Sequence, residues 1–128
     1  MAVLAPVSWG EVIDKITILE IKAERLVDAA KRVNVLKELG ELTQVRDREF
    51  PAHAQLARLA AELKAVNESL WVIEDDIRDC ERAKDFGPRF IDLARAVYVT
   101  NDERSRVKRR INDALGSALV EEKSYAPY

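Results

Sequence analysis

The sequence predicts an all-α protein, a four-helix arrangement that contains a long antiparallel, coiled-coil-like hairpin. Apolar residues recur at spacings of three and four over long stretches, which is the period of a helix rather than of a strand. Ser8 and Glu11 form the capping-box pattern that starts a helix. The chain has only four glycines and four prolines, and most of them lie where the apolar rhythm changes, so they indicate breaks between helices.

The first two helices are expected at residues 9 to about 27 and 29 to about 48. The Ser8 hydroxyl can accept a hydrogen bond from a first-turn amide while Glu11 reaches back to the cap. Asp28 suits the N-cap of the second helix. That helix should end at Phe50, because the residue before a proline is forced out of the helical region.

The hairpin is expected at residues about 51–82 and 88–115. Pro51 suits a first helical position, and Gly87-Pro88 separates the two long helices. The first of these carries a heptad-like apolar seam: Leu56, Leu59, Leu63, Val66, Leu70, Ile73, Ile77 and Cys80. Gly116 is a candidate C-cap, which leaves residues 117–128 as a C-terminal tail of a single helical domain that spans residues 1–128.

Composition narrows the function classes. With 21 Lys and Arg against 23 Asp and Glu, the net charge of −2 makes nucleic acid an unlikely partner. No membrane span and no targeting leader are expected, so a cytoplasmic protein is predicted. The sequence contains no phosphate-binding glycine loop and no zinc spacing, so no cofactor is expected. The single cysteine, Cys80, cannot form an internal disulfide.

No metal site is predicted, and the catalytic residues are left unknown. Carboxylates cluster on the third helix, but a helical cluster holds a divalent ion only if a facing helix brings further ligands. The Glu-x-x-His pairing of helical di-metal sites is absent. His53 follows the Pro51 break as a surface residue, and Cys80 closes the apolar seam as a small hydrophobe. Whether the protein is an enzyme stays open.

Several polar residues interrupt the apolar faces at mid-bundle. Arg104 occupies a seam position and requires an acidic partner, for which Glu20, Glu68 and Glu74 are the candidates. One hypothesis is a structural polar layer that fixes helix register. The alternative is a cofactor-free enzyme or sensor with a mid-bundle pocket for a small anionic metabolite, in which Arg104 and Lys15 hold the anion and Glu20 acts as acid or base. The candidate ligand-binding residues are Lys15, Glu20, Asn67, Glu74, Asn101 and Arg104.

Two apolar strips exceed what one bundle core requires. Ile18 and Ile21 lie on the polar side of the first helix, and Trp71 and Val72 lie outside the seam of the third. Such strips are covered by another chain or by a further segment of the same one. A homo-oligomer is therefore expected, with a dimer favoured, and a protein partner is possible. The primary hypothesis is a self-associating helical binding or scaffold protein.

Five segments together resemble a small bacterial family of unknown function. They are PVSWGEVIDKITILEIK at residues 6–22, VNESLWVIEDDIR at 66–78, DFGPRF at 85–90, TNDER at 100–104 and EEKSY at 121–125. The resemblance covers nearly the whole chain. It implies a loose association with cell-surface polysaccharide gene neighbourhoods, and hence with bacterial surface-glycan metabolism, but it assigns no activity, cofactor or catalytic residue.

Overall fold

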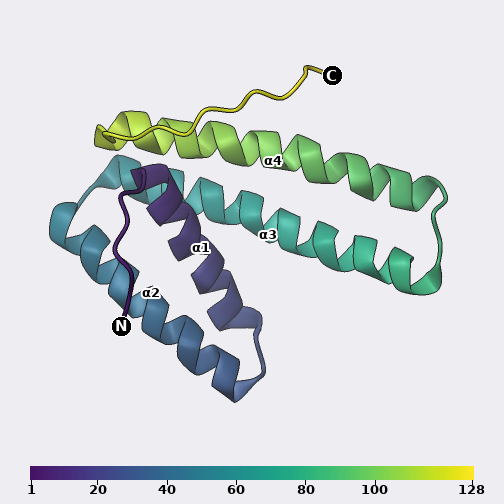
Figure 1. The fold of residues 1–128 in the computed structure, drawn as a ribbon, viewed down its shortest axis with the longest axis horizontal. Coiled ribbons are helices and arrows are strands. Elements are labelled where there is room, and N and C mark those ends of the chain that lie inside the picture. The colour runs from purple at the N-terminus through teal and green to yellow at the C-terminus, as the bar shows by residue number, and fades with distance from the viewer.

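The computed structural model describes residues 1–128, which form four helices and no strand (Figure 1). The helices are α1 (Trp9–Arg25), α2 (Ala29–Glu49), α3 (Ala54–Ala83) and α4 (Pro88–Leu115). Helices α3 and α4 run antiparallel as a long hairpin, and α1 and α2 form a shorter pair that diverges from it at one end. The predicted all-α, four-helix arrangement is confirmed.

The helix ends follow local side-chain chemistry. Ser8 Oγ accepts a hydrogen bond from the Glu11 amide at 3.2 Å, and Asp28 Oδ1 accepts one from the Lys31 amide at 3.0 Å. Both expected N-caps are therefore present. Gly116 ends α4 with φ of 62°, a left-handed conformation that glycine adopts without steric cost.

The start of α3 differs from the expected one. The helix begins at Ala54 rather than at Pro51, and His53 is its N-cap. His53 Nδ1 accepts a hydrogen bond from the Leu56 amide at 3.0 Å, while its ring meets Phe50 edge-on with centroids 5.8 Å apart. An imidazole lone pair thus satisfies a first-turn amide that has no acceptor within the helix.

The core lies at one end of the hairpin, where α1 crosses it. Its side chains come from α1, from the first half of α3 and from the second half of α4: Ile13, Ile16, Leu56, Leu59, Leu63, Val107 and Ile111. Helix α2 packs on α1 alone. Trp9 and Phe50 close the edge of this core with a T-shaped contact, their ring centroids 4.9 Å apart. Burial of apolar surface by three helices therefore stabilises only this end of the hairpin.

Beyond Asn67 the hairpin is two helices thick. The seam residues Leu70, Ile73 and Ile77 are half-buried there, and Cys80 is the only fully buried side chain of this half. Two helices cannot enclose their shared seam from both sides. We refer to this two-helix part, residues 68–100, as the distal hairpin.

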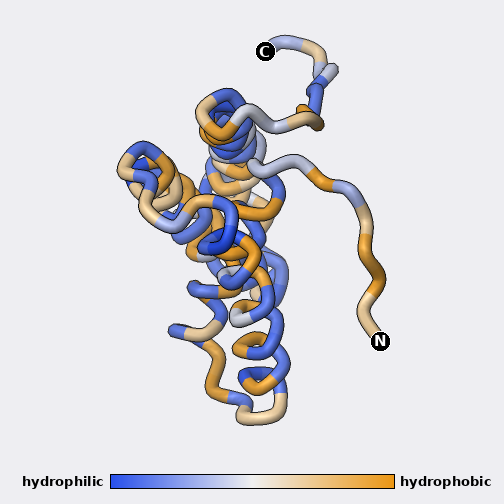
Figure 2. The backbone as a smooth tube through the Cα atoms, turned by 90° about the vertical axis from the view of Figure 1, so that its left-hand side faces the viewer, coloured by the Kyte–Doolittle hydropathy of each residue, from blue (hydrophilic) through white to orange (hydrophobic).

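The chain ends lie outside the bundle. Residues 117–128, the C-terminal tail, turn back and run along α4 (Figure 1). Residues 1–7 form an extended, exposed and largely apolar arm (Figure 2), whose first two residues line a shallow groove with Asn34 and Glu38 of α2. No helix is long and apolar enough to span a lipid bilayer.

Candidate functional site

A buried carboxylate lies where α1, α3 and α4 meet. Asp14 is 1% exposed. Arg104 Nε donates to Asp14 Oδ1 at 2.9 Å, and Arg104 Nη2 donates to Asp14 Oδ2. Asn67 Nδ2 lies 2.9 Å from both Asp14 Oδ1 and Thr17 Oγ1, and Thr17 Oγ1 donates to the Asp14 carbonyl at 2.7 Å. These four residues are called the Asp14 cluster below.

Within the Asp14 cluster, the buried charge of Asp14 is compensated by the Arg104 guanidinium and by the hydrogen bond from Asn67. The hydrogen bond and charge of Asp14 raise the pKa of Arg104 despite the opposing effect of burial. No buried side-chain nitrogen or oxygen in the chain lacks a hydrogen-bond partner. A buried charge that is paired and hydrogen-bonded is tolerated, whereas an unpaired one costs several kcal/mol. This arrangement favours the hypothesis of a structural polar layer at mid-bundle.

Sequence reasoning was wrong about the acid that pairs with Arg104. Glu20, Glu68 and Glu74 were the candidates, and the partner is Asp14. Asp14 was not among the candidates, because the apolar pattern of the first helix does not mark it as an internal residue. Helix α1 contacts α2, α3 and α4 and is therefore buried on several sides, so an acidic residue outside the main stripe can still be internal.

The other candidate ligand-binding residues are dispersed. Lys15 is exposed and pairs with Glu38 at 2.7 Å. Glu20 is half-buried on α1, away from the Asp14 cluster, and its charge helps to raise the pKa of Lys64, after the larger effect of a hydrogen bond from Lys64 to Glu24. Of the predicted set, only Asn67 and Arg104 are brought together, because both donate hydrogen bonds to Asp14.

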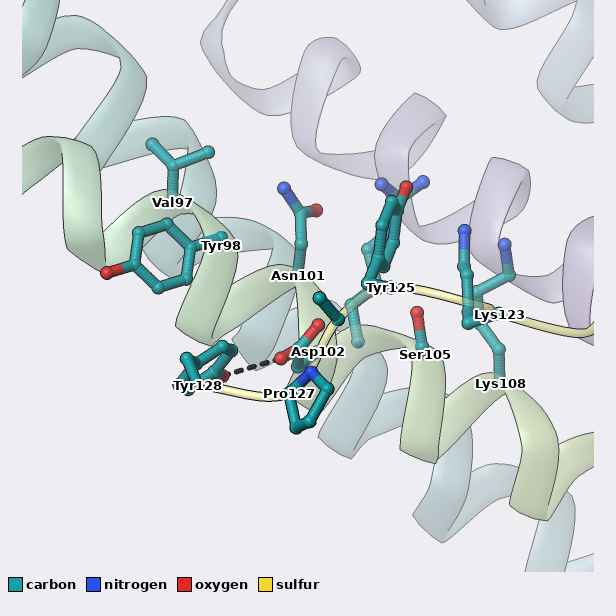
Figure 3. Close-up of a pocket in the computed structure, with 12 residues that line it drawn as sticks. Val97, Tyr98, Asn101, Asp102, Ser105, Lys108, Lys123, Tyr125, Pro127 and Tyr128 are labelled. Atoms are coloured by element: carbon teal, nitrogen blue, oxygen red, sulfur yellow. Dashed lines mark hydrogen bonds between the residues drawn. The ribbon is translucent and has the colours of Figure 1, made fainter.

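Two grooves flank Arg104. One, the tail groove, lies between α4 and the C-terminal tail, has a volume of about 820 Å³ and contains the candidate Asn101 (Figure 3). The other, the α1–α3 groove, has a volume of about 380 Å³ and contains Glu74, whose carboxylate lies 2.6 Å from Arg78. Arg104 lines both grooves, and it is the only predicted site residue that does so.

The tail groove exists because ion pairs hold the tail on α4. Glu121 contacts Lys108 Nζ at 3.0 Å and Lys123 Nζ at 2.6 Å, and Glu122 contacts Arg109 at 3.1 Å. Hydrogen bonds from Lys123 and Lys108 lower the pKa of Glu121 to about 2. Sequence reasoning left the tail unplaced, although the two acids at 121–122 complement the two bases at 108–109.

The end of the tail is held by an aromatic contact and a hydrogen bond. Tyr128 donates its hydroxyl hydrogen to Asp102 Oδ2 at 2.5 Å, and its ring meets Tyr98 edge-on with centroids 5.2 Å apart (Figure 3). Near the start of the groove, Lys108 also contacts Glu11 of α1 at 2.8 Å. Burial lowers the pKa of Lys108, but the hydrogen bonds that Lys108 donates to Glu11 and Glu121 outweigh this effect and raise that pKa.

The residues expected at an oligomer contact differ in their exposure. Ile21 is 1% exposed and Ile18 is half-buried, and both line the α1–α3 groove. Trp71 is half-buried in the same groove, with Arg25 over its ring at 5.9 Å, and Val72 is exposed. No three His, Cys, Asp or Glu side chains converge in a way that could hold a metal ion.

A protein-family model matches residues 3–127 of the chain, and its description is a family of unknown function (DUF6165). The resemblance to an uncharacterised family over nearly the whole chain is thereby confirmed. No curated protein and no solved structure matches the chain significantly.

Proposed function

We propose that this chain, which belongs to the family of unknown function DUF6165, is a binding or scaffold module that self-associates through its distal hairpin. The observation that carries the proposal is the change in burial along the hairpin. Leu63 and Ile111 are 0% exposed where α1 covers the seam, whereas Ile73 and Leu93 beyond α1 are only half-buried.

The uncovered surface continues the surface that α1 covers. On α4, Lys108 and Arg104 contact α1. Steps of three and four residues from Arg104 lead along the same helix face to Asn101, Val97 and Ala94. These residues therefore extend the α1-binding face of α4 into the distal hairpin, where no helix of the same chain lies over it.

Helix α3 supplies the other wall of this face. Asn67 contacts α1, and Leu70 and Trp71 follow on the same side and line the α1–α3 groove. Phe90 of α4 lies one further turn toward the hairpin tip and is half-buried. We call the apolar surface formed by Leu70, Trp71, Phe90 and Ala94 the distal stripe.

The size of the distal stripe fits a second copy of the chain. The hairpin continues for 16 residues from Asn67 to Ala83, which is about 24 Å at 1.5 Å per residue. Two packed helices are roughly 20 Å wide. Each copy would then bury about 500 Å², and the pair about 1,000 Å², which is at the lower limit for a specific interface.

Charge does not oppose the pairing of two identical stripes. Glu74 pairs with Arg78 on the same helix, and Glu81 pairs with Lys84 at 3.4 Å. Glu74 and Glu81 are thus compensated within each copy, which leaves Asp75 as the unpaired acid beside the stripe. A two-fold contact, in which each patch meets itself, therefore avoids most of the like-charge repulsion that identical surfaces can suffer.

The molar mass in solution tests the proposal. Light scattering after size exclusion, over about 1–100 μM protein, should give a species of twice the 14.5 kDa chain mass. Ala94→Glu, which places a charge in the stripe, should give the monomer with unchanged helical circular dichroism. Val99→Glu is the matched control, because Val99 is exposed outside the stripe, and it should remain dimeric. A monomer at every concentration for the unmodified chain, or equal effects of the two variants, would refute the proposal.

The association with bacterial surface glycans and the cytoplasmic location remain predictions from the sequence. A self-associating hairpin is compatible with a scaffold role in surface-glycan metabolism. Its assembly can be tested without knowing which partner it holds.

A further inference from the structure

Asp14 holds the guanidinium of Arg104 but accepts hydrogen bonds from only some of its N–H groups. Asp14 accepts from Nε and from one hydrogen of Nη2. Arginine carries five N–H groups, so both hydrogens of Nη1 and the second hydrogen of Nη2 remain. They form the end of the planar fork, where two parallel N–H groups suit a carboxylate or a phosphate.

The remaining N–H groups can be reached from solvent. The Arg104 side chain is 28% exposed, and no buried polar atom of the chain is without a partner. Only 2% of the Asp14 side chain is exposed, and Asn67 donates a hydrogen bond to it. Asp14 is therefore held in place and fixes the orientation of the Arg104 guanidinium. A ligand would therefore meet an arginine already held in place, which lowers the entropy lost on binding.

Of the two grooves that Arg104 lines, only the tail groove suits an anion. The α1–α3 groove places Glu74 and Asp75 beside Arg104, with Arg78, which pairs with Glu74, as its only other cation. The tail groove instead contains Lys108 and Lys123 beside Arg104, with Asp102 as its only acidic side chain. Electrostatic complementarity therefore selects the tail groove.

Further polar and aromatic groups converge in the tail groove. Asn101 and Ser105 line it from α4, and Tyr125 lines it from the tail (Figure 3). None of these side chains makes a hydrogen bond within the chain, and Lys123 Nζ lies 5.8 Å from the centre of the Tyr125 ring. The rings of Tyr98 and Tyr128 and the side chain of Val97 supply an apolar wall. Pockets with an apolar lining and a few directed polar groups are typical of small-molecule sites.

We propose that the tail groove binds a small organic oxyanion, a carboxylate or phosphate on a planar or apolar body, with the oxyanion on the free end of the Arg104 fork. Asn101 and Ser105 would hydrogen-bond the same group, and Tyr125 would cover the body of the ligand. The inference does not depend on self-association, since the groove is complete within one chain.

Titration of the full-length chain with defined probes tests this site. Benzoate and phenyl phosphate should cause saturable NMR shifts of the Asn101 amide group and of Ser105 and Tyr125. The uncharged analogue benzamide should bind at least tenfold more weakly, and so should acetate and inorganic phosphate, which lack the planar body. Equal binding of benzamide and benzoate would overturn the role of the fork. Equal binding of acetate and benzoate would overturn the role of the apolar wall.

Variants locate the site without relying on one substitution. Arg104→Lys keeps a positive charge beside Asp14 but removes the fork, and it should weaken benzoate binding at least tenfold. Because that change also affects the core, Tyr125→Ala on the exposed tail is the second variant, with a similar loss expected in a fully folded protein. Glu74→Ala in the α1–α3 groove is the matched control and should leave the affinity unchanged. A changed affinity in Glu74→Ala, with Tyr125→Ala unaffected, would place the ligand in the other groove and refute the proposal. The monomeric Ala94→Glu variant should bind benzoate as the unmodified chain does, which separates a failure of this site from a failure of self-association.

Discussion

Asp14 and Arg104 are 90 residues apart in the sequence and form a two-point ion pair at the junction of three helices. The pair joins α1 to α4, and Asn67 joins the same carboxylate to α3. One carboxylate therefore fixes how α1 crosses the hairpin. Its position, together with the burial of Ile13 and Ile16 in the core, disfavours a register of α1 displaced by a helical turn.

Removing either member of this pair should destabilise the protein. Asp14→Ala leaves Arg104 and Asn67 without their acceptor, and Arg104→Ala leaves a buried carboxylate unpaired. Each change is expected to lower the free energy of unfolding by about 2–4 kcal/mol, somewhat below the range for fully buried pairs because Arg104 is partly exposed. Urea denaturation of the two variants and of the double variant measures the coupling energy. Lys15→Ala, which removes the exposed pair with Glu38, is the control and should cost less than about 1 kcal/mol.

Two glycines in helices should respond oppositely to alanine. A Cβ at Gly10 would lie 2.6 Å from the Lys108 carbonyl oxygen and 3.0 Å from Asn112 Oδ1, which accepts from the Gly10 amide. Gly10→Ala should therefore cost about 1–3 kcal/mol through overpacking of α1 against α4. A Cβ at Gly40 meets nothing within 4 Å, so Gly40→Ala should stabilise α2 by about 0.5–1 kcal/mol. Thermal unfolding of both variants is the measurement, and a shift of both melting temperatures in the same direction would contradict the packing at Gly10.

The docking of the tail should depend on acidic pH. The pKa of Glu121 is about 2 in the folded chain against an ordinary value of 4.5. Because the folded value is the lower one, the contribution of Glu121 to docking is complete above pH 4.5 and is lost as the pH falls through 2. NMR contacts between the Tyr98 and Tyr128 rings should weaken over this window. Glu121→Gln should make them less dependent on pH, and an unchanged pH profile in that variant would show that another group controls the tail.

His53 should act as a helix cap. His53→Ala removes the acceptor of the Leu56 amide and the ring contact with Phe50, so a loss of about 1 kcal/mol is expected. His53→Asp supplies a carboxylate at the same N-cap and should recover most of that loss. Chemical denaturation followed by circular dichroism distinguishes the two variants, and an equal loss in both would assign the role of His53 to its ring contact alone.

Local patterns predicted the helices well because helices follow local chemistry. The caps at Ser8 and Asp28 and the break at Gly87-Pro88 each depend on residues a few positions apart. The start of α3 was less well predicted because histidine is an uncommon cap and Pro51 offered a more usual start. Boundaries of this kind shift by a few residues when a nearby side chain can cap the helix in place of the expected one.

The candidate site was predicted only in part, because its contacts are distant in sequence. The odd placement of Asn67 and Arg104 on apolar faces indicated a polar layer, and both belong to it. Asp14 gave no such indication, since a helix buried on several sides has no single stripe from which a residue can deviate. The tail groove could not be predicted, because it depends on where an irregular segment lies.

The uneven thickness of the hairpin divides the protein into parts of different cooperativity. Backbone amides of the three-helix end exchange with solvent deuterium only when the whole core opens. Amides of the two-helix end have only their mutual seam to protect them, so they exchange through smaller and more frequent openings. The protein thus combines a rigid base with an arm that can change shape at low energetic cost, and association through that arm would slow its exchange while leaving the base unaffected.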